Sequence, residues 1–273
     1  MTLSKKIDFA VIFSVKNANP NGDPLNGNRP RISYEGIGEV SDVCLKRKIR
    51  DRLMEKGCGI FVQSEEKKND DATSLKSRAD SQLGKIKDKK EFATAACKKW
   101  LDVRAFGQVF AFKAAKGDDS GVSVGVRGPV TVQTAFTVVP INITSTQITK
   151  SVNGEDTKDG KKASDTMGMK HRVDAGTYIF FGSMNPQLAE LTGFDDDDAQ
   201  MIKEILPKLF ENDASSARPE GTMRVANVFW WQHNCKTGQY SSAKVHGSLT
   251  VQEDGSYAIE ELDGLSPEII PGF

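Results

Sequence analysis

Apolar and β-branched residues along the chain predict a fold that is built mainly from strands. Stretches in which Val, Ile, Phe and Thr are frequent, or in which apolar and polar positions alternate, are typical of strands. The expected strands are Ile7–Val15, Asp102–Phe112, Val122–Val139, His171–Gly182 and Met223–Gln232. Lys244–Val251 and Tyr257–Leu262 are expected to pair as a hairpin around Glu253–Ser256.

Helical spacing of apolar residues is clearest near residue 50. Leu45, Ile49 and Leu53 lie four residues apart, which predicts a helix with one buried stripe. The acidic run Asp195–Asp198 suits the positive end of a second helix, and Pro207 should kink or end that helix.

The order of these elements predicts an α+β fold, in which an antiparallel sheet carries helices on one face. Two insertions interrupt the expected sheet. Residues 64–100 are highly charged and poorly apolar until Phe92–Trp100, which predicts a helical insertion that faces solvent. Residues 142–169 include Gly154–Lys162, which has no hydrophobic face and has the composition of a protruding arm.

The formal net charge is zero, because 37 Lys and Arg balance 37 Asp and Glu. This balance excludes a uniformly basic nucleic-acid protein and a strongly anionic disordered chain. The charge is nevertheless uneven. Residues 1–186 hold 31 Lys and Arg against 22 Asp and Glu, a net charge of +9, and residues 187–273 hold 6 against 15, a net charge of −9.

The composition also bears on the compartment. No apolar run approaches the roughly 18–20 residues that a membrane helix needs, and the N-terminus lacks the apolar core and cleavage site of a signal peptide. The four cysteines form no C-x-x-C pair and, with only three histidines, no zinc spacing. We expect a reduced cytoplasmic protein with structural thiols, without a cofactor, a metal or a membrane partner.

A turn-rich loop and the helix after it form the strongest candidate site. The loop over 17–31 is rich in Asn, Gly and Pro, so its backbone N–H groups can turn toward an anion. Ser41 caps the following helix, whose N-terminus adds partial positive charge. Five cations can add contacts to phosphate, namely Arg29, Arg31, Lys46, Arg47 and Arg50. The alternative is a solvated helix face beside an irregular loop.

Other segments give weaker signals for nucleic acid. Arg104–Phe110 faintly resembles the aromatic strand of an RNA-recognition motif, but a core strand is the favoured interpretation. Arg127 precedes a Gly-Pro turn and is either a phosphate contact or a solvated arginine. The run Lys170-His171-Arg172 could bind a phosphate or simply flank a strand. Met167 and Met169 could insert between bases, or cover a neighbouring surface.

Catalytic patterns are scarce in the sequence. No Ser/His/Asp or Cys/His arrangement is suggested by the spacing. Asp23, Asp42 and Asp102 are candidate magnesium ligands, because hard oxygen ligands suffice for this ion. Aspartates in loops, at helix caps and at strand starts are, however, common for structural reasons.

Several collinear motifs resemble the backbone subunit of a CRISPR Cascade surveillance complex of subtype I-C. The resemblance runs through most of the chain. It rests on Asn19–Pro24, Gly27–Arg31, Ser41–Arg50, Asp102–Gly107, Arg127–Gln133 and Gly176–Gly182.

The resemblance implies a single domain with the shape of a right hand. Its palm is a modified RNA-recognition-motif (ferredoxin-like) antiparallel sheet over 1–57, 101–140 and 171–273. Residues 58–100 would be helical fingers and residues 141–170 a β-hairpin thumb.

The resemblance also implies partners and a role. Copies of the subunit polymerise along one guide RNA, which pairs with a strand of invading DNA, and the complex holds other Cascade subunits and recruits a helicase-nuclease. The subunit itself is expected to be no enzyme. The alternative is a metal-dependent ribonuclease of the same fold that uses Asp23, with Asp42.

The residues expected to bind RNA combine these two lines of reasoning. They are Asn19, Asn21, Gly22, Asn28, Arg29, Arg31, Ser41, Lys46, Arg47, Arg50, Arg104, Arg127, Gln133, Met167, Lys170, His171 and Arg172. Lys46, Arg47 and Arg50 are expected to share an exposed helix flank, so their joint neutralisation should weaken RNA binding. The acidic segment with Asp195–Asp198 is expected to face away from the RNA.

Overall fold

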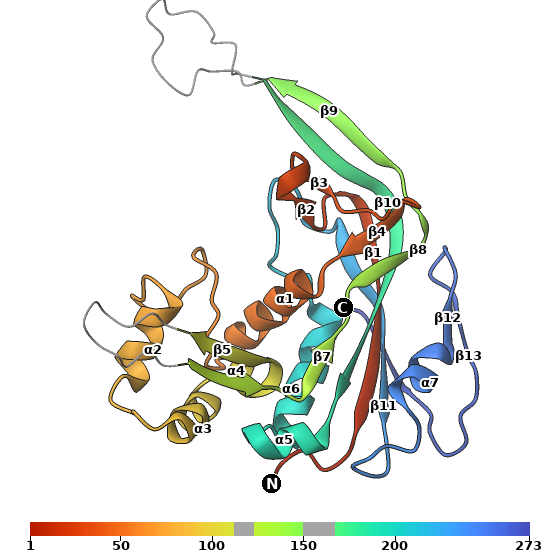
Figure 1. Ribbon diagram of the computed structural model, residues 1–273. Coiled ribbons are helices and arrows are strands. Elements are labelled where there is room, and N and C mark those ends of the chain that lie inside the picture. The colour runs from red at the N-terminus through yellow and green to blue at the C-terminus, as the bar shows by residue number, and fades with distance from the viewer. Residues whose placement is uncertain (112–122, 150–166) are drawn as a thin grey trace, which may run out of the picture.

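The centre of the molecule is a twisted antiparallel sheet (Figure 1). The computed structural model describes residues 1–111, 123–149 and 167–273. Within them, the sheet has the strand order β14-β11-β1-β10-β8-β4, and β7 and β9 also pair with β10. Its strands are β1 (Ile7–Ala18), β4 (Ile37–Val40), β7 (Val130–Val132), β8 (Ala135–Pro140), β9 (Ile143–Thr149), β10 (Met167–Met184), β11 (Met223–Gln232) and β14 (Glu268–Pro271).

Helices and small hairpins surround this sheet. The helices are α1 (Asp42–Glu55), α2 (Leu75–Leu83), α3 (Lys89–Lys99), α4 (Leu101–Phe106), α5 (Pro186–Thr192), α6 (Asp196–Ile205) and α7 (Ser242–Gly247), with short 3₁₀ turns at Pro24–Asn26 and Leu206–Lys208. The hairpins are β2 (Gly22–Asp23) with β3 (Arg29–Pro30), β5 (Gly107–Ala111) with β6 (Ser123–Arg127), and β12 (Leu249–Val251) with β13 (Tyr257–Ile259).

Both faces of the sheet are covered, which corrects the expectation of helices on one face only. Phe9, Val11 and Phe13 of β1 belong to the core under α1 and α6. Ala10 and Ile12 point the other way, into a second core with Val245 of α7 and residues of the β12–β13 hairpin. Figure 1 shows α7 and this hairpin across the sheet from α1. The nearly continuous apolar run of β1 is typical of a strand that is buried on both faces.

The first predicted helix is confirmed. Leu45, Ile49 and Leu53 are fully buried, and the Ser41 Oγ accepts the Cys44 N–H at 3.3 Å as the N-cap. The second predicted helix, α6, is followed at Leu206 by a 3₁₀ turn that contains Pro207, as its ring geometry favours.

Two segments that were predicted as strands are partly helical. Leu101–Phe106 forms α4, which ends at Gly107 with a φ of 80°, and only Gly107–Ala111 is a described strand. Likewise Ser242–Gly247 is a helix capped by Ser241, and the confirmed hairpin is confined to β12 and β13. In both places a local cap and tertiary burial outweigh the β propensity of the side chains. The predicted strand ends within 112–122 lie outside the described residues.

The two predicted insertions contain the expected kinds of element. Residues 58–100 include α2 and α3, which enclose an apolar cluster of their own. Phe110 of β5 and Val124 of β6 complete this cluster, so the β5–β6 hairpin packs with the insertion. The protruding arm is the hairpin β9–β10, with Met167 opposite Thr149. Its predicted segment Gly154–Lys162 lies outside the described residues.

All four cysteines are free thiols. Over the described parts of the chain, none of the helices is long and apolar enough to span a membrane.

A buried polar cluster joins β1 to the C-terminal part of the chain. The Asp8 carboxylate is fully buried and accepts a hydrogen bond of 2.9 Å from the His233 Nε2. The Gln239 backbone N–H donates to the His233 Nδ1 at 2.9 Å, which places the proton of the neutral ring on Nε2. Lys6 Nζ lies 3.0 Å from Asp8, and His246 Nε2 of α7 lies 3.4 Å from it.

These neighbours determine the ionisation of Asp8. Burial raises the pKa of Asp8, but His233, His246 and Lys6 lower it more, so the pKa lies well below its ordinary value of 3.8. The carboxylate therefore stabilises the folded state above about pH 4, and this stabilisation is lost as the pH falls below that value.

We predict that Asp8→Asn lowers the free energy of unfolding by about 3–5 kcal/mol, because it leaves buried donors without their charged acceptor. Urea titrations at neutral pH measure this loss. Between pH 4 and pH 2 the variant should lose less further stability than the unsubstituted protein. Asp197→Asn on the exposed side of α6 is the control and should change stability by less than about 0.5 kcal/mol. Equal losses in the two variants would contradict the role of Asp8.

Candidate nucleic-acid interface

A groove of about 730 Å³ lies between α1, the β5–β6 hairpin and β7, and it brings two predicted cations together. Lys46 of α1 and Arg127 at the end of β6 both line it. The remaining lining residues are all uncharged: Phe106, Gly107, Gln108, Val109, Val126, Gly128, Val130, Thr131 and Val132. Cations above an apolar floor without carboxylates form a surface that suits a phosphate backbone.

Two glycines allow the turns beneath this groove to meet. A Cβ on Gly107 would lie 2.4 Å from the Val126 carbonyl oxygen, and one on Gly128 would lie 2.3 Å from the Ala105 carbonyl oxygen. Gly107 also has a φ of 80°, which favours glycine. The predicted motifs around residues 107 and 128 thus pack against each other, and this contact was not evident from their separation in the sequence.

The ionic partners of the predicted cations differ along α1. Lys46 Nζ pairs with Asp42 at 2.9 Å and keeps partial exposure. Arg50 is only 13% exposed, lies 5.2 Å from the Phe106 ring, and its Nε donates to Asp102 at 2.9 Å. The expectation that Lys46, Arg47 and Arg50 share one exposed flank is therefore wrong. Arg50 lies behind the groove and holds its wall in place.

Arg47 belongs to a separate ionic cluster. It pairs with Asp51 at 2.9 Å and with Asp213 at 3.0 Å. Asp213 also pairs with the fully buried Lys48 and with Arg218. Burial raises the pKa of Asp213, but the three cations lower it more, so the pKa lies below its ordinary value. This carboxylate fastens the loop after α6 to α1.

Arg104 is also held by an acidic residue from the C-terminal part. Its Nε and Nη2 donate to the two oxygens of Asp198, each at 2.6 Å. Burial lowers the pKa of Arg104, but Asp198 raises it more, so the pKa lies above its ordinary value. Asp198 is buried against Arg104 of the basic part of the chain and does not line the groove, and Asp196 and Asp197 are exposed. The pairing joins residues 94 positions apart, and no local pattern indicates it.

The turn-rich loop is internally bonded. The Asn19 side chain donates to the Asn28 carbonyl oxygen at 2.7 Å, and Asn21 Oδ1 accepts from both the N–H and the hydroxyl of Ser41. Gly22 leaves room for the Asn28 side chain, since a Cβ there would lie 2.0 Å from Asn28 Oδ1. The amides and hydroxyl expected to face RNA therefore shape the loop and fasten it to α1.

The arginines of this loop differ in their partners. Arg31 lies 3.6 Å from Asp23, and both side chains are about one-third exposed. Arg29 is half-buried and has no ionic partner within the described residues. Arg29 is therefore the cation of this loop that is most available to a ligand.

The predicted residues of the protruding hairpin lie on its two faces. Met167, Met169 and His171 occupy every second position of β10 and so lie on one face. The His171 Nδ1 lies 2.8 Å from the Ser145 hydroxyl. Lys170 and Arg172 point to the opposite face. The two methionines are more than half exposed. Gln133 lies apart from this hairpin, exposed beyond β7, where its backbone N–H donates to Phe181.

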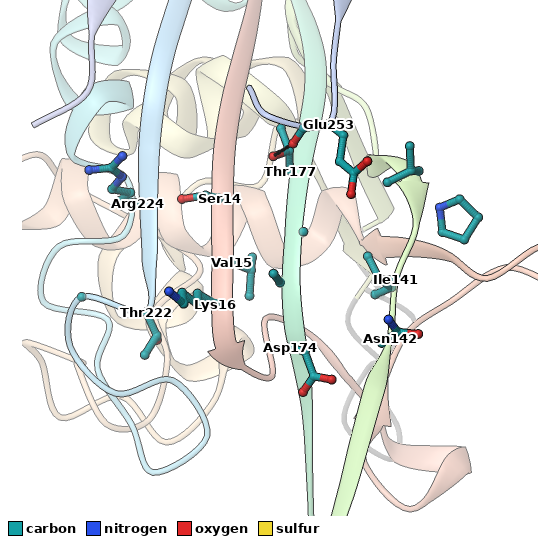
Figure 2. A pocket seen from close by; sticks show the side chains of 15 residues that line it. Ser14, Val15, Lys16, Ile141, Asn142, Asp174, Thr177, Thr222, Arg224 and Glu253 are labelled. Atoms are coloured by element: carbon teal, nitrogen blue, oxygen red, sulfur yellow. Dashed lines mark hydrogen bonds between the residues drawn. The ribbon is translucent and has the colours of Figure 1, made fainter. Parts of the chain in front are cut away.

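A second groove of about 570 Å³ lies on the sheet face away from α1, and it contains none of the predicted residues (Figure 2). Lys16 and Arg224 line it from β1 and β11. Figure 2 shows Asp174 and Glu253 on its other side. Because this groove carries both signs of charge, it is less suited to a polyanion than the groove beside Lys46 and Arg127.

The aspartates considered as magnesium ligands have other contacts. Asp23 accepts from the Leu25 N–H and lies near Arg31, and Asp42 pairs with Lys46. Asp102 is buried and accepts from the N–H groups of Phe61 at 2.7 Å and Val62 at 3.0 Å. The described residues contain no group of three or more His, Cys, Asp or Glu side chains that could hold a metal ion.

We predict that Asp102→Asn lowers the free energy of unfolding by about 3–5 kcal/mol, because Arg50 and the two N–H groups lose a charged acceptor. Chemical denaturation measures this loss. Asp88→Asn is the matched control, since asparagine caps α3 as well as aspartate does. A loss of less than about 1 kcal/mol for Asp102→Asn would show that this carboxylate is not the anchor between α1 and α4.

Comparisons with known proteins agree with the geometry of the fold. The family described as CRISPR-associated protein Cas7 matches residues 5–265. A curated relative of that description from Haloferax volcanii is 26% identical over 299 aligned residues, which cover 98% of this chain and 86% of the relative. A chain of a solved CRISPR RNA-guided surveillance complex in a pre-nicking state has a TM-score of 0.50 and 15% identity, covering 83% of this chain and 78% of that one. A second such complex gives a TM-score of 0.46 at 18% identity, covering 92% and 77%. The chain thus belongs to the CRISPR-associated Cas7 family.

Proposed function

We propose that this chain is the subunit that coats guide RNA and forms the backbone of a type I-C Cascade complex. The observation that carries the proposal is the groove that unites Lys46 and Arg127 without an acidic lining residue. Family membership supports a place in a CRISPR surveillance complex.

Backbone contacts are the chemistry that such a subunit needs. Lys46, Arg127 and Arg29 would bind the phosphates of the guide, and phosphate contacts position a strand without reading its bases. Any guide sequence can then be accepted, while base pairing with the target DNA strand supplies the specificity. The apolar floor with Phe106 and Val109 gives the sugars and bases a surface to pack on.

We further propose that the chain is shaped like a hand. Its palm would be a sheet of the RNA-recognition type over 1–57, 101–140 and 171–273, with fingers over 58–100 and a thumb over 141–170. The β9–β10 hairpin projects beyond the sheet (Figure 1), where it can reach a neighbouring copy on the same guide. Lys170 and Arg172 would add cations on one face of that arm. A two-stranded ribbon is marginally stable alone, which supports a partner for it.

In this proposal the subunit works in the cytoplasm of a bacterium, beside other Cascade subunits and a recruited helicase-nuclease. It is not itself a nuclease. Incubation of the purified complex with magnesium and labelled complementary RNA should leave the RNA intact. Cleavage that is lost in Asp23→Ala would instead favour the ribonuclease alternative.

We predict that the double variant K46Q/R127Q binds single-stranded RNA more weakly. The slope of log K against log salt concentration should shrink by about 1.4, since each phosphate contact to a single strand contributes about 0.7. Fluorescence anisotropy across a salt series measures both quantities. The control K56Q/K236Q removes two exposed lysines that pair with Glu204 and Glu190 outside the groove, and it should bind RNA normally.

Unchanged affinity and slope for K46Q/R127Q would refute the groove as the guide site. The assembly itself is tested by mass measurement before and after nuclease treatment. The proposal expects co-purified RNA and several copies of the chain, and a monomer without RNA would contradict it.

A further inference from the structure

A tight turn in the acidic C-terminal part of the chain contacts the turn-rich loop. We call it the anchor turn, and it consists of residues 213–218. Its backbone is closed by two hydrogen bonds between Ser215 and Arg218, at 2.9 and 3.0 Å. Between these two residues, the Ala217 carbonyl oxygen accepts the Asn19 N–H at 2.8 Å. The anchor turn therefore meets the turn-rich loop directly after the end of β1.

Ion pairs fix the anchor turn to α1. The Arg218 Nε donates to the Asp213 carboxylate at 3.1 Å, and the same carboxylate pairs with Lys48 and Arg47 of α1. Lys48 is fully buried, so its charge requires Asp213 as a partner. Asp213 thus holds the start of the anchor turn against α1, and Arg218 ties the end of the turn to the same carboxylate.

Asn19 connects the anchor turn to the far side of the loop. Asn19 is only 4% exposed, and its side-chain Nδ2 donates to the Asn28 carbonyl oxygen at 2.7 Å. The Asn28 N–H in turn donates to the Asp23 carbonyl oxygen at 2.8 Å. Residues 24–28 are exposed, so packing does little to fix this part of the loop. Arg29 follows at once, and its position therefore depends on the hydrogen bond from Asn19.

We propose that Arg218 and Asp213 are positioning residues for Arg29, and that Asn19 transmits their effect. This inference rests on the proposed function, in which Arg29 binds a phosphate of the guide. A cation that is held in place before the RNA arrives binds more tightly, because the cost of ordering its loop has already been met. The acidic part of the chain would in this way contribute to RNA binding without touching the RNA.

The test measures binding of single-stranded RNA by the full chain with R29Q, R218Q or both. R29Q should weaken binding about fourfold at about 0.15 M salt and reduce the salt slope by about 0.7, which is the contribution of one phosphate contact. R218Q should weaken binding by about two- to fourfold. In the R29Q background, R218Q should add less than about 1.5-fold, because the residue that it positions is already absent.

R218Q is the informative substitution in the anchor turn. It leaves Asp213 paired with Lys48 and Arg47. D213N, in contrast, would leave the buried Lys48 without a charged partner and would destabilise the whole chain.

K203Q is the matched control. Lys203 pairs with Glu268 at 2.6 Å and ties α6 to β14, and its side chain is 16% exposed against 22% for Arg218. K203Q should therefore cost similar stability and leave RNA affinity unchanged. Amide hydrogen exchange of the protein without RNA adds a direct readout. Exchange of the Asn19 N–H should become faster in R218Q and stay unchanged in K203Q.

Three results would overturn the proposal. The first is an equal loss of RNA affinity in R218Q and K203Q, and the second is an unchanged affinity in R29Q. The third is additive losses in R29Q/R218Q with unchanged exchange at Asn19, which would identify Arg218 as a phosphate contact of its own. The proposed function fails separately, when K46Q/R127Q binds RNA normally, because neither groove residue is part of the R29Q/R218Q comparison.

Discussion

The fold depends on burying β1 on both faces while it pairs with β10 and β11. The first seven residues of β1, Ile7–Phe13, are buried, so the polar residue among them, Asp8, must be satisfied from within the protein. His233 and Lys6 do so, and His246 brings α7 close to the same carboxylate. This arrangement ties the first strand to the last third of the chain. It also provides the rigid base on which α1, the β5–β6 hairpin and the projecting β9–β10 hairpin are held.

Charge is distributed between structure and surface. Asp198 and Asp213, from the acidic C-terminal part, pair with Arg104, Arg47 and Lys48 of the basic part, so part of the opposite charge cancels inside the molecule. Among the remaining cations, Arg29, Lys46 and Arg127 keep the exposure that marks the candidate RNA surface. A neutral chain can in this way present local positive fields that suit phosphate backbones.

The groove with Lys46 and Arg127 is recessed between elements, as a single strand held along its backbone requires. The expected contacts in this groove go to phosphates, so base pairing by the guide remains the source of sequence specificity.

The sequence alone determined the elements whose signals are local. The stripe of Leu45, Ile49 and Leu53, the Ser41 cap, the β12–β13 hairpin and the collinear motifs of the family could all be predicted, because each depends on neighbours within a few residues. Tertiary structure decided the rest. It made Leu101–Phe106 a helix, covered the second face of the sheet, and paired Arg50 with Asp102 and Arg104 with Asp198. The two ion pairs join residues that are 52 and 94 positions apart in the sequence. Burying a charge beside its partner stabilises the fold, but it produces no periodic pattern in the sequence.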